Sequence, residues 1–536
     1  MSSQPEHPIN RRQFIGQASC AGISMAPLLS TLLTLRLANS LAAQTTTGND
    51  YRALVCLFLS GGNDSFNMLV PTTSGEYEAY AKVRGNLALA KDSVLSITPG
   101  NLGGRTLGIH PSMTEVRDLF NQGRAAFVSN VGSLVRPMTL TDYKAGRSLP
   151  LSLYSHADQI KQWQTCMPDQ RTAIGWGGRA ADIIRGLNSP SLVSMNISLS
   201  GQSVFLTGRD AFTYSVSSGG ATALTGYSPT AVNSLTAQRT KGVDSVMDQK
   251  YRNLFEQTYA QSTSDAVDSY YEFSSALSGA TLTTAVPTGN SLASSLSMIA
   301  RIIASRSKLG AQRQIFFVQL GGWDHHDEVI NNQLTMLRTV SQAIGFFSSA
   351  LTEIGLADRV TLFTASDFGR TLTSNGNGSD HAWGGNHLVM GGAVAGGKVY
   401  GDAAAGYYPD FRNLSQIDTG QGRLIPGVAV DEYARDLLSW FGVSNSNMDY
   451  VLPAFSSRFG GRPTLGLFTG SSSVTDPTPP TTPTTPTTPT TPSTTPPTSS
   501  GGGGGGGAPS PIFLGALGAL ALARLRQKRM AKKKSG

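Results

Sequence analysis

Short apolar runs recur along the central part of this chain, and each ends in a cluster of polar residues. The clearest runs cover residues 51–59, 125–131, 315–320 and 359–365. Runs of this length bounded by glycine and polar residues are typical of strands buried on both faces, and a short buried helix segment is the alternative. Helical patterns lie between the runs. This alternation predicts an α/β fold with a mostly parallel central sheet flanked by helices.

The pattern changes between residues 190 and 300, where Ser, Thr, Ala and Gly dominate. A helix is predicted there over 244–277. We interpret 190–300 as an insertion in, or a cap on, a single α/β domain that covers 51–445. A short C-terminal extension, 446–474, is expected to follow this domain.

The first 43 residues have the order of a signal peptide. The paired Arg11 and Arg12 precede Gln-Phe-Ile, a mildly apolar stretch covers 18–41, and two small residues close the segment. A charged start, an apolar middle and a small-residue cleavage site indicate export, and an uncleaved N-terminal anchor is the alternative. The paired Arg motif resembles a twin-arginine (Tat) signal. This predicts the Tat translocon as a partner and a location in the periplasm, on the cell surface or outside the cell.

The C-terminal end has three parts. Residues 475–510 form a Pro/Thr-rich and Gly-rich linker, and 511–536 combine a short apolar stretch with a basic end. The apolar stretch 511–523 would make a helix of about 20 Å, short of a hydrocarbon core of about 30 Å. Together these parts resemble Gly-Gly sorting signals cut by rhomboid-type proteases, and a plain tail anchor is the alternative. Either reading predicts at least transient membrane contact through the tail.

Charge excludes one class of partner. The chain has a formal net charge of +8, but seven Lys or Arg lie in residues 524–536. The central domain is therefore close to neutral, and it offers no electrostatic case for nucleic-acid binding. Cys56 and Cys166 are isolated, so they are predicted to be packing residues, with a disulfide or a reactive thiol as the alternatives.

Four of the seven His lie between residues 325 and 387, each near an Asp. The carboxyl ends of parallel strands meet at one edge of a sheet, where ligands bind in α/β proteins. Imidazole and carboxylate groups together suit a divalent metal. Asp324 and His326, two residues apart after one run, can converge on an ion while His325 points away. Each His taken singly is equally a hydrogen-bonded structural residue.

Further candidates follow the next apolar run. Asp367 ends that run, and a loop predicted over 374–387 contains Asp380, His381 and His387. Two metal ions a few Å apart stabilise the attacking and leaving oxygens in phosphoryl or sulfuryl transfer. His156, near Asp158, begins a predicted helix, where backbone amides attract anions.

Several short motifs resemble a bacterial family of domains of unknown function, number 1501. They are FLSGGNDSFN (58–67), GIHP (108–111), SHADQ (155–159), GGWDHH (321–326), SDFGRT (366–371), DHAWGGNH (380–387) and IPGVAVD (425–431). The resemblance places the chain near the alkaline phosphatase and sulfatase superfamily, and it implies an alkaline-phosphatase-like fold. It also implies that Asp64 binds one metal and that Asp324 and His326 bind a second.

One motif departs from that superfamily. Its usual Asp-His-Gly triplet reads Asp367-Phe368-Gly369 here, so one His ligand is missing. The resemblance implies that His381 takes the place of this ligand and that His387 is the last His ligand. The nucleophile has no clear match.

The resulting prediction is an exported metal-dependent hydrolase of phosphate or sulfate esters, acting on a small-molecule or polymeric substrate. Zn, Mn or Ca is expected, in two sets of ligands: Asp64, Asp367 and His381, and Asp324, His326 and His387. Ser155 is the predicted nucleophile, ahead of Ser152 and Thr139, and His156 is the second catalytic candidate. The alternative is a non-catalytic cell-surface or ligand-binding protein that retains the sulfatase-like fold.

Overall fold

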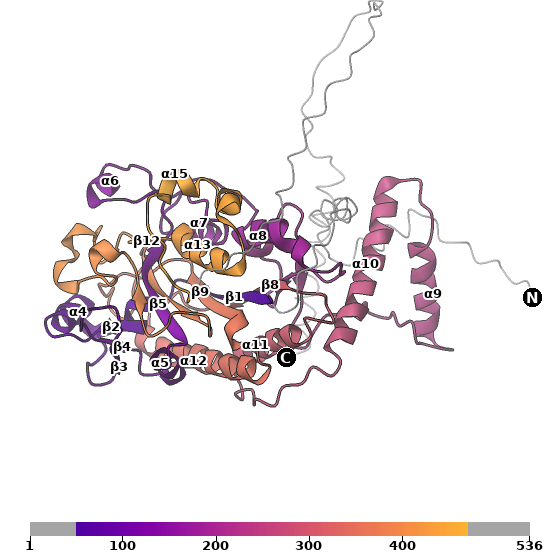
Figure 1. The fold of residues 1–536 in the computed structure, drawn as a ribbon, viewed down its shortest axis with the longest axis horizontal. Helices are drawn as coiled ribbons and strands as arrows, with labels where there is room; N and C mark the ends of the chain where they lie inside the picture. Colours follow the sequence, from indigo (N-terminus) through magenta and orange to yellow (C-terminus); the bar gives the residue numbers. More distant parts are fainter. Residues whose placement is uncertain (1–49, 470–536) are drawn as a thin grey trace, which may run out of the picture. The chain divides into compact units, whose positions relative to one another are not determined.

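The computed structural model describes residues 50–469. The predicted signal peptide (1–43), the end of the predicted extension, the linker (475–510) and the tail (511–536) lie outside this range. Figure 1 shows a central sheet with helices on both faces. No helix within the described range is long and apolar enough to cross a membrane.

Within the described residues the main sheet has nine strands, in the order β11-β5-β10-β9-β1-β8-β6-β7, and β12 pairs with β5. The strands are β1 (Arg52–Leu59), β5 (Ala125–Gly132), β6 (Asn196–Ser198), β7 (Thr213–Ser215), β8 (Arg313–Leu320), β9 (Val360–Ser366), β10 (Gly385–Met390), β11 (Val399–Tyr400) and β12 (Val428–Ala429). Every pairing is parallel except those of β10 with β5 and β9. The predicted mostly parallel sheet flanked by helices is confirmed.

The register of the three central strands positions the site. All eight residues of β1 are buried, as expected for an apolar run between two neighbours. Leu59, the last residue of β1, pairs with Leu320 of β8 and with Ser366 of β9. The three carboxyl ends are therefore level, and the polar segments after them emerge at one edge of the sheet.

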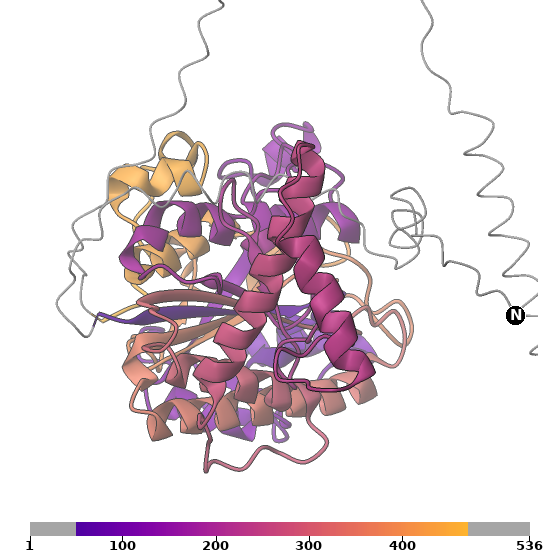
Figure 2. The ribbon, with the colours of Figure 1, turned by 90° about the vertical axis from the view of Figure 1, so that its right-hand side faces the viewer.

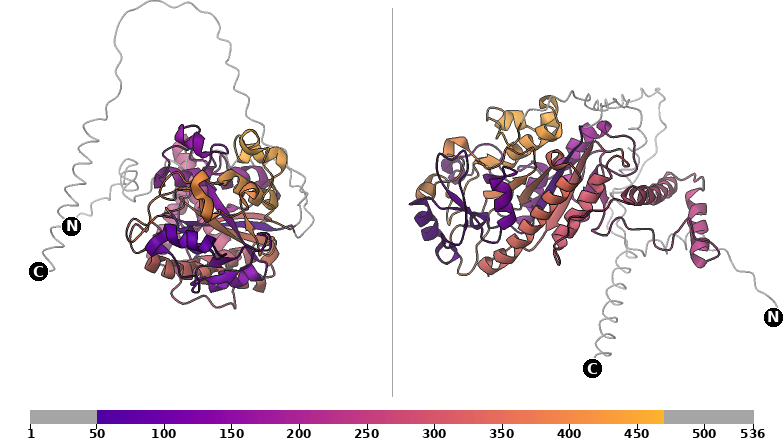
Figure 3. Two further views of the ribbon diagram at one scale, coloured as in Figure 1. Left: turned by 90° about the vertical axis from the view of Figure 1, so that its left-hand side faces the viewer. Right: turned by 60° about the horizontal axis from the view of Figure 1, so that its bottom comes forward.

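Helices cover the two faces of this sheet (Figures 1 and 3). One face packs against α5 (Thr114–Asn121), α11 (Ser291–Ala304) and α12 (Val329–Glu353). The other packs against α7 (His156–Thr165), α8 (Trp176–Ile184) and α13 (Val430–Phe441). A smaller three-stranded sheet, β2-β4-β3, lies beside α4 (Glu76–Arg84), with strands Leu69–Pro71, Leu107–Ile109 and Leu95–Ile97.

The structure differs from the predicted elements in two places. The predicted loop 374–387 ends early, because β10 begins at Gly385 and inserts antiparallel between β5 and β9. The helix predicted over 244–277 is two helices, α9 (Leu235–Met247) and α10 (Leu254–Leu277). Within 190–300, β6 joins the main sheet beside β8, and β7 continues it.

Candidate metal centre at the carboxyl edge of the sheet

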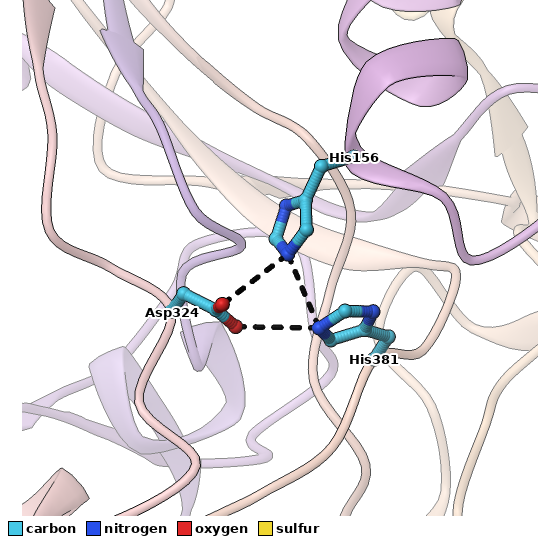
Figure 4. Close-up of side chains that lie close together, drawn as sticks. All are labelled: His156, Asp324 and His381. Atoms are coloured by element: carbon cyan, nitrogen blue, oxygen red, sulfur yellow. Dashed lines mark hydrogen bonds and ion pairs between the residues drawn. The ribbon is translucent and has the colours of Figure 1, made fainter.

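Four side chains from three segments meet at the carboxyl edge of the sheet. Asp324 and His326 follow β8, and His156 is the first residue of α7. His381 lies in a hairpin after β9, where it forms an antiparallel bridge with Arg370. Figure 4 shows His156, Asp324 and His381 pointing toward one another.

The ligand-type atoms of these residues converge on a small volume. The Nε2 atom of His381 lies 3.1 Å from Nε2 of His156 and 2.9 Å from Nε2 of His326. The Asp324 carboxylate is 3.4, 3.1 and 3.3 Å from Nε2 of His156, His326 and His381 respectively. One atom each from His156, Asp324 and His381 lies within 4.8 Å of the other two.

The opposite nitrogen of each imidazole already has an acceptor. Nδ1 of His156 is 2.7 Å from the Asp367 carboxylate, and Nδ1 of His326 is 3.1 Å from the Asp380 carboxylate. Nδ1 of His381 is 2.9 Å from the backbone carbonyl of Tyr154. Since a carbonyl or carboxylate oxygen only accepts, these contacts assign the proton of each neutral ring to Nδ1.

This tautomer leaves the Nε2 lone pair of His381 facing those of His156 and His326, with the Asp324 carboxylate beside all three. Neutral imidazoles in that arrangement repel unless a cation or a proton lies between them. Three imidazole nitrogens and one carboxylate oxygen are ligands for Zn²⁺ and similar ions. Metal-bound His residues ordinarily donate their second N–H to a carboxylate or a backbone carbonyl, as all three do here. The residues present therefore fit a divalent metal.

Arg370 fixes the charge of Asp324. Its buried guanidinium donates from Nη1 to Asp324 Oδ1 at 2.8 Å. Partial burial opposes ionisation of Asp324, but the hydrogen bond and the charge of Arg370 outweigh it, so the pKa of this carboxyl lies below its usual value. Burial and the charge of Arg370 lower the pKa of His381, against the hydrogen bond to Tyr154, and favour its neutral form. A neutral imidazole beside an ionised carboxylate is the state that binds a cation.

Asp367 contacts Nδ1 of His156, on the side of the ring opposite the Nε2 atom that faces His381. Its Oδ1 accepts from the backbone N–H of Gly61 at 3.0 Å, and its Oδ2 contacts His156. Burial raises the pKa of Asp367. The ring of Phe368 lies 4.7 Å from the rings of both His156 and His381. Phe368 is thus an apolar wall of the site, packed against the rings of His156 and His381.

Asp64, predicted as a metal ligand, faces a different partner. Its Oδ2 forms an ion pair with Nη2 of Arg84 at 2.7 Å and accepts from Ser379 Oγ at 2.9 Å. Both members of the ion pair are almost fully buried. Arg84 is the last residue of α4, twenty residues after Asp64. A guanidinium and a hydroxyl therefore already bind Oδ2 of this carboxylate, whereas Oδ1 is buried without a hydrogen-bond partner among the described residues.

His387, also predicted as a ligand, lies within β10 among aromatic rings. Its ring is 4.5 Å from that of Trp163 and 6.1 Å from that of Tyr433. Complete burial lowers the pKa of His387 to about 3, which keeps it neutral. The structure does not bring it to the four converging side chains, because β10 carries its side chain into the core.

Ser155, the predicted nucleophile, directly precedes His156 at the start of α7. Its Oγ donates to Asp158 Oδ2 at 3.2 Å. Burial opposes ionisation of Asp158, but hydrogen bonds from Arg171, Ser155 and Ser152 outweigh it and lower the pKa of this carboxyl. A carboxylate with a lowered pKa is a weak base, so Asp158 does little to activate the Ser155 hydroxyl.

Two contributors to the site were not predicted. Arg370 was visible only as part of the SDFGRT motif, and no local pattern links it to Asp324, 46 residues earlier. Tyr154 contributes a backbone carbonyl, which has no residue-type signal. Its φ of 73° is unusual for a non-glycine residue.

Comparisons with solved structures give distant likenesses. The crystal structure of Ps i-CgsB in complex with k-i-k-neocarrahexaose is 11% identical, with a TM-score of 0.31 over 76% of this chain and 77% of that one. The lipoteichoic acid synthase LtaP from Listeria monocytogenes is 7% identical, with a TM-score of 0.28 over 80% and 81%. The PsFucS1 sulfatase from Pseudoalteromonas sp. is 10% identical, with a TM-score of 0.29 over 79% and 73%.

Comparisons with sequences give one clear result. No curated protein matches this chain. A protein-family model, described as "Protein of unknown function (DUF1501)", matches residues 51–413. This range begins just before β1 and contains all four converging side chains.

Proposed function

We propose that this chain, which belongs to the family described as "Protein of unknown function (DUF1501)", is a metal-dependent hydrolase of phosphate or sulfate esters. One observation carries the proposal: three imidazole Nε2 atoms and one carboxylate converge, while each Nδ1 atom has its own acceptor. A single divalent ion, Zn, Mn or Ca, would be held by His156, Asp324, His326 and His381. Asp64 and His387 have no part in this set.

The surrounding residues have definable tasks. Asp367 and Asp380 hold the Nδ1 protons of His156 and His326 and so orient their rings. A divalent metal supplies a Lewis acid that polarises an ester oxygen. Arg423 donates from Nε to the His381 carbonyl, which places a positive charge beside the site. That charge suits an anionic ester, the substrate class that the sequence resemblance implies.

The proposal includes the location of the protein. We propose export through the Tat translocon to the periplasm, the cell surface or the medium, because the first 43 residues have the order of such a signal. The C-terminal tail would provide at least transient membrane attachment and a site for a rhomboid-type protease. The small-molecule or polymeric ester would then be met outside the cytoplasm.

A second candidate is a ligand-binding protein without catalysis. The Ser155–Asp158 contact favours it, because the predicted nucleophile donates to a weak base. In that case the same four residues would hold a metal that binds an anion without cleaving it. Turnover separates the two candidates, whereas metal content does not.

Metal content tests the shared part of both candidates. The purified protein is loaded with Zn²⁺, Mn²⁺ or Ca²⁺, dialysed and analysed by elemental mass spectrometry. We expect about one ion per chain, lost in His381→Ala and in Asp324→Asn. Asp210→Asn is the control, since Asp210 only pairs with Arg185 at the surface. Absence of stoichiometric metal in the natural chain would overturn the proposal.

Activity is tested next, on p-nitrophenyl phosphate and p-nitrophenyl sulfate. We expect release of p-nitrophenol by the loaded natural chain and by Asp210→Asn, and none by His381→Ala. Binding of phosphate or sulfate to the loaded protein without turnover would favour the second candidate. Turnover that persists in Ser155→Ala would show that the hydroxyl of Ser155 is not the nucleophile.

A further inference from the structure

The hairpin of α9 and α10 exposes an unusual number of large apolar side chains. Within residues 50–469, seven of the eleven exposed large apolar residues lie between 224 and 271, so they are concentrated on and beside this hairpin. The most exposed are Val232 (78%), Phe255 (70%), Leu235 (62%) and Leu254 (59%). Exposed apolar side chains gathered in this way mark interaction surfaces.

Only one end of the hairpin is anchored to the sheet. Phe273 near the end of α10 lies 5.5 Å from the Tyr214 ring on β7, and Tyr214 donates to the carbonyl of Ser269. Figures 1 and 2 show α9 and α10 beyond the side of the sheet where β8 lies, and β7 is the edge strand on that side. A 24-residue helix such as α10 is about 36 Å long, so most of it extends past this anchor.

The two parts of the hairpin, residues 235–253 and α10, carry opposite net charge. α10 has four carboxylates, at Glu256, Asp265, Asp268 and Glu272, and no Lys or Arg. Residues 235–253, which comprise α9 and the turn, hold four basic and two acidic side chains. Opposite charges on complementary surfaces steer and orient association.

We propose that the hairpin is a dimerisation arm that pairs with the hairpin of a second copy of this chain. In an isologous pair each surface meets its own equivalent. Antiparallel packing sets residues 235–253 of one copy against α10 of the other, so the basic segment meets the acidic helix in both halves. The same arrangement brings Leu254 and Phe255, at the turn, near Val232 and Leu235, at the far end of the partner hairpin. Both groups of exposed apolar side chains are then buried between the two copies.

A membrane surface is the competing occupant, and the charges disfavour it. Leu254 and Phe255 neighbour Lys250 and Arg252, a combination that also suits a lipid interface. However, the four carboxylates of α10 would face the same anionic surface and be repelled. A second copy offers a basic surface to the acidic helix α10 and an acidic surface to the basic segment 235–253.

The first test measures the mass of the full chain by light scattering. One copy has a mass of 56.4 kDa, and we expect twice that value at tens of micromolar protein. Leu254→Ser with Phe255→Ser should weaken the dimer at least tenfold, about 1.4 kcal/mol. Leu334→Ser is the matched control, because Leu334 is exposed on α12, away from the hairpin. Circular dichroism and thermal melting verify that each variant is folded.

Charge reversal gives an independent test. Arg239→Glu with Lys241→Glu in one chain, and Asp265→Lys with Asp268→Lys in another, should each weaken self-association. Mixing the two chains should restore a dimer, because the reversed helices are again complementary. A monomeric natural chain at 100 µM, or a dimer that the hairpin changes leave intact, would overturn the proposal. So would a monomer that binds phosphatidylglycerol vesicles through Phe255.

Discussion

Replacing Arg84 by Met tests whether Asp64 is a structural anion instead of a metal ligand. The side chains of this pair are 0% and 1% exposed, and their charged atoms lie 2.7 Å apart. Arg84 also donates to Asn67 Oδ1 and to the carbonyl of Leu372. Met fills a similar volume without these donors. Arg84→Met therefore leaves a buried carboxylate without its counter-charge.

Removing one member of a buried ion pair destabilises a protein by about 3–5 kcal/mol. We expect Arg84→Met to lower the free energy of unfolding by about that amount. Adding Asp64→Asn removes the uncompensated charge, so the double variant should recover roughly 1–3 kcal/mol of the loss. Arg117→Met is the control. Arg117 pairs with Asp118, whose side chain is 56% exposed, and an exposed pair contributes about 0–1 kcal/mol.

Urea unfolding, monitored by tryptophan fluorescence, measures these differences. Each difference in the free energy of unfolding is the shift in the urea midpoint multiplied by the dependence of that free energy on urea concentration. Metal content is measured on the same samples, and Asp64→Asn should keep the full metal stoichiometry. A loss below about 1 kcal/mol for Arg84→Met would contradict the structural role of the pair. Loss of metal from a folded Asp64→Asn chain would refute the reasoning altogether, since Asp64 would then be a ligand.

Three further predictions follow from the same contacts. Asp367→Asn should weaken metal binding about 10–100-fold in competition titrations, because one neutral amide oxygen replaces the two carboxylate oxygens that contact Gly61 and His156. Buried His387 is neutral in the folded state with a pKa of about 3, whereas an unfolded His has a pKa of about 6.5. The contribution of His387 to the free energy of unfolding is therefore complete above about pH 6.5. It declines as the pH falls toward 3, and at pH 5 it is lower by about 2 kcal/mol. His387→Phe should flatten this part of a plot of melting temperature against pH, and an unchanged plot would contradict it. Gly61→Ala should lower stability by about 1–3 kcal/mol and disturb metal binding, since φ is +123° and a Cβ would lie 2.5 Å from the Asp324 backbone nitrogen. Equal melting temperature and metal affinity in Gly61→Ala would count against this account of the turn.

The sequence predicted the edge of the sheet where the site forms. Apolar runs such as 315–320 indicate buried strands. Parallel pairing of these strands then aligns the polar residues that follow them. Asp324, His326 and His381 were predicted as ligands, and the structure brings them together. His156 also lies there, because the helix that it begins packs on the same edge.

The roles of the other predicted site residues depend on contacts with side chains and carbonyls that are distant in the sequence, and the sequence does not indicate these contacts. Asp64 has the same local signal as Asp324, and only the packing of α4 reveals that Arg84 pairs with it. His387 was placed at the end of a predicted loop, yet Gly385–Met390 is a strand buried on both faces. Which nitrogen of each imidazole points to the centre is set by acceptors as distant as Tyr154 and Asp380.

The central position of β1 also affects how the chain is made. Its eight buried residues pair only with β8 and β9, so both partners are synthesised about 250 or more residues later. At translation rates of roughly 5–20 residues per second, this apolar segment waits on the order of 10–50 s for its neighbours. During that interval its backbone hydrogen-bonding groups and side chains are open to non-native association. We therefore expect the nascent chain to depend on chaperones until β9 emerges, and chaperone depletion should cause aggregation of chains truncated before residue 360.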